Sequence, residues 1–280
     1  MSDTLTIQDH RRDAVGMTYV YPVISRRAGG VSVGINLNPN NACNWRCVYC
    51  QVPDLARGGP PPLDMAQLER ELRTMLDDIL HGQFMQERVA LDMRHLSDVA
   101  FSGNGEPTSA REFPLAVALA ARVLRELGLA GQVKLRLITN GSLLDRPSVR
   151  QGIAALGQTG GEVWFKLDAA TPGAIQRING SRQNPAAMLR RLQQCAQLCA
   201  TWVQSCVFAL DGSPPGADEI EAYLGMIAAA GDNLAGVHLY GLARPSCQPE
   251  AARLTRLPAT WLEALAERLR AQGLRVDVSP

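Results

Sequence analysis

Three cysteines near the start of the chain are the residues best suited to chemistry. Cys43, Cys47 and Cys50 are spaced C-x3-C-x2-C, within eight residues and with no fourth cysteine nearby. A closed iron–sulfur cubane takes four protein thiolates, and a structural zinc site takes four Cys or His ligands. Three ligands on one loop therefore indicate a metal centre that leaves one position open. A zinc site and three structural thiols are the alternatives, although local zinc pairs usually run C-x2-C.

Two further motifs carry groups that suit a bound ligand. The run F-S-G-N-G-E-P, 101–107, is a glycine-rich turn that ends in a carboxylate and exposes backbone groups. The run L-I-T-N-G, 137–141, places Asn140 at a predicted strand end, and its amide is both a donor and an acceptor. Taken alone, the first motif equally fits a turn with an incidental Glu, and the second an Asn-Gly turn.

A lysine and an aspartate are candidates for contact with a substrate. In E-V-W-F-K-L-D, 162–168, Lys166 and Asp168 lie on the polar face of a predicted strand, near its carboxyl end. A buried Lys binds a carboxylate, forms a Schiff base with a carbonyl, or moves a proton once burial has lowered its pKa. We expect this pair to act on the substrate, and the alternative is a structural ion pair inside the fold.

Strands and helices that alternate along the chain must position these groups. Strands are expected near 31–37, 98–102, 133–139, 162–168, 203–210 and 235–240, with a short last strand at 274–278. Helices are expected near 64–90, 109–127, 147–156, 185–200, 216–230 and 259–271. This order predicts an α/β fold, a partial (β/α)6 barrel of parallel strands in a single domain over 31–280. The stretch 1–30 is interpreted as an N-terminal strap or cap.

Each predicted strand has one apolar and one polar face. In V-S-V-G-I-N-L-N, 31–38, Val31, Val33 and Ile35 share one face, whereas Ser32 and Asn36 share the other. If helices cover the apolar faces, the polar faces converge on the barrel lumen and form a reaction chamber. The alternative is an ordinary sheet with one solvated face.

Composition limits the classes of function. The net charge of +1 gives no strongly basic footprint, so nucleic acid as the main partner is not indicated. Seven cysteines, an odd number in a chain of 280 residues, argue against a disulfide framework and indicate the reduced thiols of the cytoplasm. The beginning of the chain shows no signal peptide, and no apolar run approaches the ~20 residues of a membrane span.

The cysteine spacing, with Tyr49 before the last cysteine, resembles the radical S-adenosylmethionine (radical SAM) enzymes. The resemblance extends from about Tyr19 to the C-terminus and implies a 4Fe–4S cluster on Cys43, Cys47 and Cys50 with SAM at its open iron. The turn at 103–106 resembles the G-G-E turn that holds the amino group of SAM in this family, with Asn104 at the second glycine position. The residues implied to bind SAM are Tyr49, Gly103, Asn104, Gly105, Glu106, Asn140 and Tyr240.

The resemblance also implies the reaction. One electron, from a donor such as flavodoxin or ferredoxin, cleaves SAM to methionine and a 5′-deoxyadenosyl radical, which abstracts a hydrogen atom from an unidentified substrate. Within the superfamily the chain resembles the Fe–S oxidoreductases related to the wyosine-tRNA synthases. Those synthases add N-terminal cysteines, and no cysteine precedes Cys43 here. An RNA-modifying radical SAM enzyme and a non-catalytic Fe–S or zinc module are the alternatives.

Four more cysteines are expected to hold no second cluster, and Cys195, Cys199 and Cys206 are interpreted as packing residues. Cys195 and Cys199 are four residues apart on a predicted apolar helix stripe, Cys206 falls in a strand, and Cys247 lies in a distant loop. A free Cys behaves as a small hydrophobe in such places.

Overall fold

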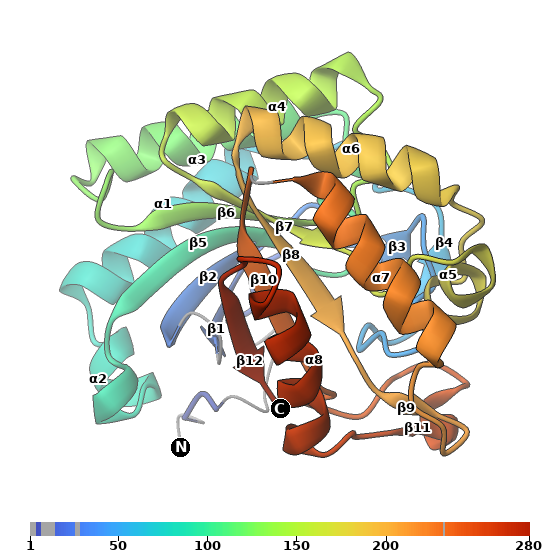
Figure 1. Ribbon diagram of the computed structural model, residues 1–280. Helices are drawn as coiled ribbons and strands as arrows, with labels where there is room; N and C mark the ends of the chain where they lie inside the picture. Colours follow the sequence, from blue (N-terminus) through green and yellow to red (C-terminus); the bar gives the residue numbers. More distant parts are fainter. Residues whose placement is uncertain (1–3, 7–14, 26–28, 232) are drawn as a thin grey trace.

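A curled eight-stranded sheet forms the centre of the computed structural model, which describes residues 4–6, 15–25, 29–231 and 233–280 (Figure 1). Its first strand is antiparallel to the second, and the remaining neighbours are parallel. The strands, in spatial order, are β1 (Val20–Ser25), β2 (Gly30–Asn36), β5 (Leu96–Ser102), β6 (Lys134–Thr139), β7 (Glu162–Lys166), β8 (Ala200–Cys206), β10 (Leu234–Tyr240) and β12 (Val276–Ser279).

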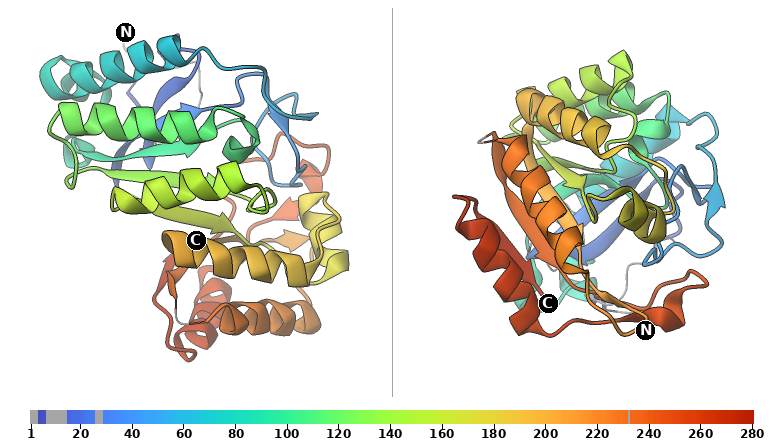
Figure 2. Two further views of the ribbon diagram at one scale, coloured as in Figure 1. Left: turned by 90° about the horizontal axis from the view of Figure 1, so that it is seen from above. Right: turned by 45° about the vertical axis from the view of Figure 1, so that its right-hand side comes forward.

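Helices cover the convex outer face of this sheet (Figures 1 and 2). They are α1 (Met65–His81), α3 (Phe113–Glu126), α4 (Pro147–Gln158), α6 (Pro185–Leu198), α7 (Ala217–Ala230) and α8 (Ala259–Arg270). The short helix α2 (Phe84–Arg88) follows α1, and α5 (Pro172–Asn179) follows β7. The predicted α/β class and the partial barrel of parallel strands are therefore confirmed. No helix of the described part of the chain is long and apolar enough to cross a membrane.

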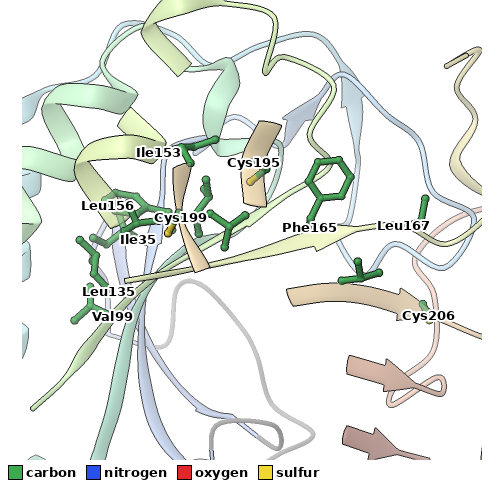
Figure 3. Packing of buried hydrophobic residues seen from close by; sticks show 14 of the residues in the cluster. Ile35, Val99, Leu135, Ile153, Leu156, Phe165, Leu167, Cys195, Cys199 and Cys206 are labelled. Carbon is green, nitrogen blue, oxygen red and sulfur yellow. The ribbon is translucent and has the colours of Figure 1, made fainter. Parts of the chain in front are cut away.

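The apolar faces of the strands form the core under the helices. Val31, Val33 and Ile35 are fully buried in β2. Figure 3 shows Ile35, Leu135 and Leu156 in this buried cluster, to which Cys195 and Cys199 also belong. Because side chains alternate along a strand, burial of this face directs the other face into the lumen.

The beginning of the chain adds an edge strand to the sheet. Strand β1 pairs with β2 from Val20 opposite Ile35 to Ser25 opposite Gly30. The Glu71 carboxylate of α1 accepts hydrogen bonds from the backbone N–H groups of 18–20, which fixes the entry to this strand. Residues 1–3, 7–14 and 26–28 of the predicted strap lie outside the described residues. The division at residue 30 remains a prediction.

Besides β1, two small strand pairs and one short helix were absent from the expectation. Strand β3 (Ala42–Cys43) pairs with β4 (Ala56–Arg57), and β9 (Ala209–Leu210) pairs with β11 (Leu254–Thr255). Helix α5 begins after Thr171, whose hydroxyl accepts a hydrogen bond from the N–H of Ala174. It ends at Gly180, which adopts the left-handed conformation with φ 57°. All three lie at the end of the molecule where the parallel strands terminate (Figure 1).

Candidate active site

A cavity of about 300 Å³ opens where the parallel strands end. Its volume is at the lower end of the range typical of small-molecule sites. The predicted site residues that line it are Cys43, Cys47, Tyr49, Cys50, Gly103, Asn104, Gly105, Glu106, Asn140, Lys166 and Tyr240. Asp168 does not line this cavity. Its carboxylate accepts a hydrogen bond from the hydroxyl of Tyr49, which does line it. Segments that are far apart in sequence therefore meet at one site, as the strand ends of a barrel require.

Helix α5 supports one side of the loop that carries the three cysteines. The backbone N–H of Arg46 donates to the carbonyl of Asn179 over 3.1 Å, and the N–H of Val48 donates to Ile178 over 2.8 Å. The Arg57 guanidinium bonds the carbonyl of Gly180 and that of Asn44. The last carbonyls of a helix lack intrahelical partners, so these amides both complete the helix end and fix the loop.

The segment 244–250 supports the other side of the cysteine loop. The N–H of Cys247 donates to the carbonyl of Cys50 over 2.9 Å, and the Ser246 hydroxyl donates to the carbonyl of Val48 over 2.7 Å. An ion pair joins Arg46 to Glu250 at 2.5 Å. The cysteine loop is thus held between two segments of distant sequence, which makes it a preformed site rather than a free loop.

Burial keeps the thiols of Cys43 and Cys47 protonated when no cation is bound. Desolvation raises the pKa of Cys43 to about 11 and that of Cys47 to about 12. A metal must therefore displace these protons as it binds. Within the described residues, no group of three or more His, Cys, Asp or Glu side chains is arranged to hold a single metal ion. A cubane does not need that convergence, because its iron atoms are several and each takes its own thiolate.

The glycine-rich turn after β5 lies against the cysteine loop. Gly103 has φ +129°, and a Cβ there would lie 2.5 Å from the side-chain oxygen of Asn36. A Cβ at Gly105 would lie 2.1 Å from the backbone carbonyl of Ala42. Glycine is therefore required at both positions, since only its absent side chain permits this approach. The Asn104 amide donates to the side-chain oxygen of Asn41 over 2.6 Å, which ties the turn to the base of the loop.

Glu106, the carboxylate of this turn, is already bound by protein donors. Its Oε1 accepts from the Thr108 hydroxyl at 2.6 Å, the Thr108 N–H at 3.2 Å and the Thr139 hydroxyl at 2.5 Å. Its Oε2 accepts from the N–H of Asn140 at 2.7 Å. Burial raises the pKa of Glu106, and these hydrogen bonds oppose the rise. Oε2 retains one lone pair for a further donor, so the residue both joins β5 to β6 and faces the cavity.

Asn140 connects the end of β6 to the cysteine loop. Its amide nitrogen donates to the side-chain oxygen of Asn44 at 2.9 Å, and its oxygen accepts from the Ser142 hydroxyl at 2.6 Å. The Asn44 amide donates to the same hydroxyl at 2.8 Å and closes the ring of three side chains. One amide hydrogen of Asn140 is left for a ligand by this arrangement.

Lys166 and Asp168 are linked through Tyr49. The Lys166 ammonium donates to the Tyr49 hydroxyl at 2.6 Å, and this hydroxyl donates to Asp168 Oδ2 at 2.5 Å. The backbone N–H of Cys206 donates to Asp168 Oδ1 at 3.0 Å. Burial lowers the pKa of Lys166, but Tyr240 and Asp168 outweigh it, so the pKa is raised. The ammonium form is therefore favoured. The lowered pKa that would let Lys166 move a proton is not what the structure gives.

Charged residues deeper in the lumen are paired with one another. Arg136 bonds Asp98 and lies 3.2 Å from Glu162, which also bonds Lys134. The Arg136 guanidinium lies 4.9 Å from the ring centroid of Trp164. Because these acids and bases pair with one another, the network has a structural role, and we call Asp98, Lys134, Arg136 and Glu162 the charged floor of the lumen.

Sequence reasoning missed several residues of the site. Asn179 contacts Cys47, and Asn44 contacts Asn140. Cys206, interpreted as a packing residue, lines the cavity, whereas Cys195 and Cys199 are buried in the core away from it (Figure 3). The one available signal was N-G at 179–180, which is typical of a helix end followed by a left-handed residue. The absence of a second cluster remains a prediction.

The comparisons with known proteins identify one enzyme superfamily. The family model of the radical SAM superfamily matches residues 37–224, and the chain belongs to that superfamily. Its members are catalytic and use a 4Fe–4S cluster and S-adenosylmethionine, so the cofactors expected from the sequence are confirmed for the family.

A curated relative and two solved structures are similar to this chain. The UPF0026 protein MJ1312 of Methanocaldococcus jannaschii is 30% identical over 159 residues, a match that covers 56% of this chain and 42% of that protein. The chain spans less than half the length of the curated relatives that it matches.

The structural matches show the shared fold. A structure of TYW1, a wyosine synthase, with a lysine-pyruvate adduct bound is 17% identical with a TM-score of 0.58, covering 87% of this chain and 74% of that one. A radical SAM methyltransferase from Sphaerobacter thermophilus is 14% identical with a TM-score of 0.60, covering 92% and 68%.

Proposed function

We propose that this chain reductively cleaves SAM at a 4Fe–4S cluster held by Cys43, Cys47 and Cys50 and abstracts a hydrogen atom from a further substrate. The observation that carries this proposal is the meeting of the three thiols and the turn 103–106 in one cavity at the strand ends. The residues present fit the cofactors. Three free thiols on one loop suit a cluster with one open iron, and the two glycines leave space for backbone contact with a ligand.

When bound, the cluster and SAM supply one-electron cleavage of the sulfonium C–S bond and the radical that removes hydrogen. The chain itself binds and orients. Glu106 Oε2 accepts a hydrogen bond from the ammonium of SAM with its remaining lone pair. The free amide hydrogen of Asn140 reaches a ribose hydroxyl or the carboxylate, and Tyr240 flanks the adenine. Tyr49, beside the last cysteine, borders the SAM site.

Lys166 binds the substrate in this proposal. Its raised pKa keeps the ammonium charged, which favours ion pairing with a carboxylate over attack on a carbonyl, because only the neutral amine is a nucleophile. Asp168 holds Tyr49 and, through it, the orientation of the ammonium. The substrate is thus expected to carry a carboxylate. Borohydride trapping of a Lys166 adduct with pyruvate would instead favour a Schiff base, the chemistry suggested by the adduct in TYW1.

Anaerobic reconstitution tests the core of the proposal. Wild-type protein should hold about four irons and equivalent sulfide, and replacement of Cys43, Cys47 and Cys50 by Ala should remove both. With a strong reductant and SAM, the wild type should release 5′-deoxyadenosine slowly. Stoichiometric zinc without sulfide would refute the assignment. A cluster that never cleaves SAM would identify a non-catalytic module.

Lys166→Met separates the substrate role from a structural one. Asp168 keeps three donors without Lys166, namely Tyr49, Asn179 and the backbone of Cys206, so the variant should fold, bind the cluster and cleave SAM. It should fail with the true substrate. A large loss of both thermal stability and uncoupled SAM cleavage would favour the structural ion pair. Small carboxylic acids and bulk tRNA, assayed for stimulation of wild-type SAM cleavage, distinguish a metabolite substrate from an RNA-modifying enzyme.

A further inference from the structure

Asn179, the last residue of α5, contacts the most deeply buried of the three cysteines. Its side chain is fully buried, and Nδ2 lies 3.4 Å from Cys47 Sγ and 2.7 Å from Asp168 Oδ2. An amide nitrogen carries two hydrogens, so it donates to both atoms at once. Asn179 therefore links the cysteine loop to the end of β7.

Asp168 fixes the direction in which this amide points. A carboxylate oxygen accepts, and Oδ2 receives the Tyr49 hydroxyl and the Asn179 amide together. Reversal of the amide would set its oxygen against that carboxylate oxygen. The Asn179 Oδ1 has no hydrogen-bond partner within the described part of the chain. A buried acceptor without a partner is unfavourable, so the two donor contacts, with Asp168 and Cys47, determine the orientation of the amide.

The position of the donor matters because the cysteine sulfur is a ligand in the proposed function. One-electron reduction, from [4Fe–4S]2+ to [4Fe–4S]+, adds a negative charge that spreads onto the ligand sulfurs. A hydrogen bond to a ligand sulfur stabilises the more negative state and raises the reduction potential. Burial strengthens the effect, because the local dielectric constant is low.

We propose that Asn179 is a positioning residue that donates an N–H···S hydrogen bond to the Cys47 thiolate and raises the reduction potential of the cluster. The inference rests on the proposed function, since it requires a cluster on this loop. The chain of contacts continues from Asn179 through Asp168 and Tyr49 to Lys166. Lys166, which is proposed to face the substrate, is thus connected through Tyr49 and Asp168 to the amide that contacts Cys47.

Redox titration with dithionite, followed by electron paramagnetic resonance of the reconstituted protein, tests the inference without an activity assay. Asn179→Leu keeps the branched shape of the side chain and removes both donors, and Asn179→Ser shortens the side chain so that it no longer reaches the sulfur. Both should shift the midpoint to a more negative potential at full iron content. Ile178→Ala is the matched control, because it alters packing in the same turn and keeps the amide; its midpoint should equal that of the wild type.

The outcomes separate the inference from the proposed function. Unchanged midpoints in both Asn179 variants at full iron content would overturn the inference and leave the proposed function intact. Loss of iron from both Asn179 variants, with retention in Ile178→Ala, would also overturn it, since the residue would then serve to retain the cluster. A wild type that forms no cluster would overturn the proposed function itself.

Discussion

Some residues that are proposed to bind the ligand also make hydrogen bonds that hold the protein together. Glu106 is proposed to bind SAM, yet four hydrogen bonds already join its carboxylate to Thr108, Thr139 and Asn140. Asn140 is similarly engaged with Asn44. A substitution at either position therefore changes the shape of the site before it changes the contact with a ligand.

Glu106→Gln should destabilise the protein even without cofactors. Whichever way the amide turns, its NH2 group faces either the N–H of Asn140 or the donors on Thr108, so at least one buried hydrogen bond is lost. We expect a loss of about 1–3 kcal/mol in the free energy of unfolding, measured by urea denaturation of the apo-protein. The variant should also bind SAM more weakly, and this loss should be larger than any loss of iron from the reconstituted protein.

The matched control is Glu112→Gln at the start of α3, whose side chain makes no capping hydrogen bond. It should leave the urea midpoint unchanged. Equal stabilities of Glu106→Gln and the wild type would show that the four hydrogen bonds contribute nothing net.

At the scale of elements, α5 and the strand ends determine the shape of the cysteine loop. The sequence predicted the strands of the barrel because their alternating apolar residues repeat over five or more positions, as in Val31, Val33 and Ile35. It did not reveal α5, because a helix of eight residues spans little more than two turns and gives a weak periodic signal. The loop's hydrogen bonds to α5 were unpredictable for the same reason.

Gly180→Ala should loosen the cysteine loop. Gly180 has φ +57°, and a Cβ there would lie 2.8 Å from the backbone carbonyl of Arg46. The strained conformation alone costs about 1 kcal/mol, and relief of the contact displaces the loop. We expect lower thermal stability and faster loss of iron to a chelator. Gly173→Ala, in the first turn of the same helix with open space around it, is the control and should match the wild type. Equal chelation rates for the two variants would contradict this role.

The stability that the charged floor of the lumen contributes to the protein should depend on pH. Burial raises the pKa of Glu162, but Lys134 and Arg136 outweigh it, so the pKa falls below the ordinary 4.5. A lowered carboxyl pKa contributes stability that is complete above the unfolded value and is lost as the pH falls through the folded value. The paired acids should therefore stabilise the protein at neutral pH and stop doing so in acid.

Arg136→Met measures this contribution. The side chain of Asp98 is 2% exposed and would lose its cation, so the variant should lose about 3–5 kcal/mol at pH 7. The difference from wild type should shrink in acid, because the stability that Glu162 contributes is lost as the pH falls through its lowered folded-state pKa. Urea denaturation across this range checks both statements, with Arg125→Met on the exposed face of α3 as the control. A difference that is constant with pH would show that lost packing, not charge, is responsible.

For the whole molecule, the sequence predicted more of the architecture than of the site's internal bonding. The strand and helix order fixed a curled parallel sheet, and the polar faces of its strands converged as expected. The roles of Asn44, Asn179 and the segment 244–250 depend on contacts between residues more than 90 positions apart. No local pattern encodes such contacts, so they emerge only once the sheet has closed around them.

Thiol labelling of the apo-protein should report this architecture. Cys247 is exposed, whereas burial raises the pKa of Cys195 and of Cys199 to about 12. Only thiolates react with iodoacetamide at a useful rate, so Cys247 should be modified first and the two helix-end cysteines only when urea unfolds the chain. Peptide mass spectrometry gives the order. Labelling of Cys195 before the unfolding transition would reveal local opening of α6.

The two-sided support of the cysteine loop has a consequence for how the protein is made. The loop leaves the ribosome early, but the segments that hold it, 178–180 and 244–250, leave late. At about 5–20 residues per second, the 200 residues between Cys50 and Glu250 take roughly 10–40 s to synthesise. During that interval the thiols of the nascent chain are unshielded and open to oxygen. If the loop holds a cluster as proposed, we expect iron and sulfide to be delivered after translation, and a chaperone that shields the emerging loop to raise the yield of cluster-loaded protein.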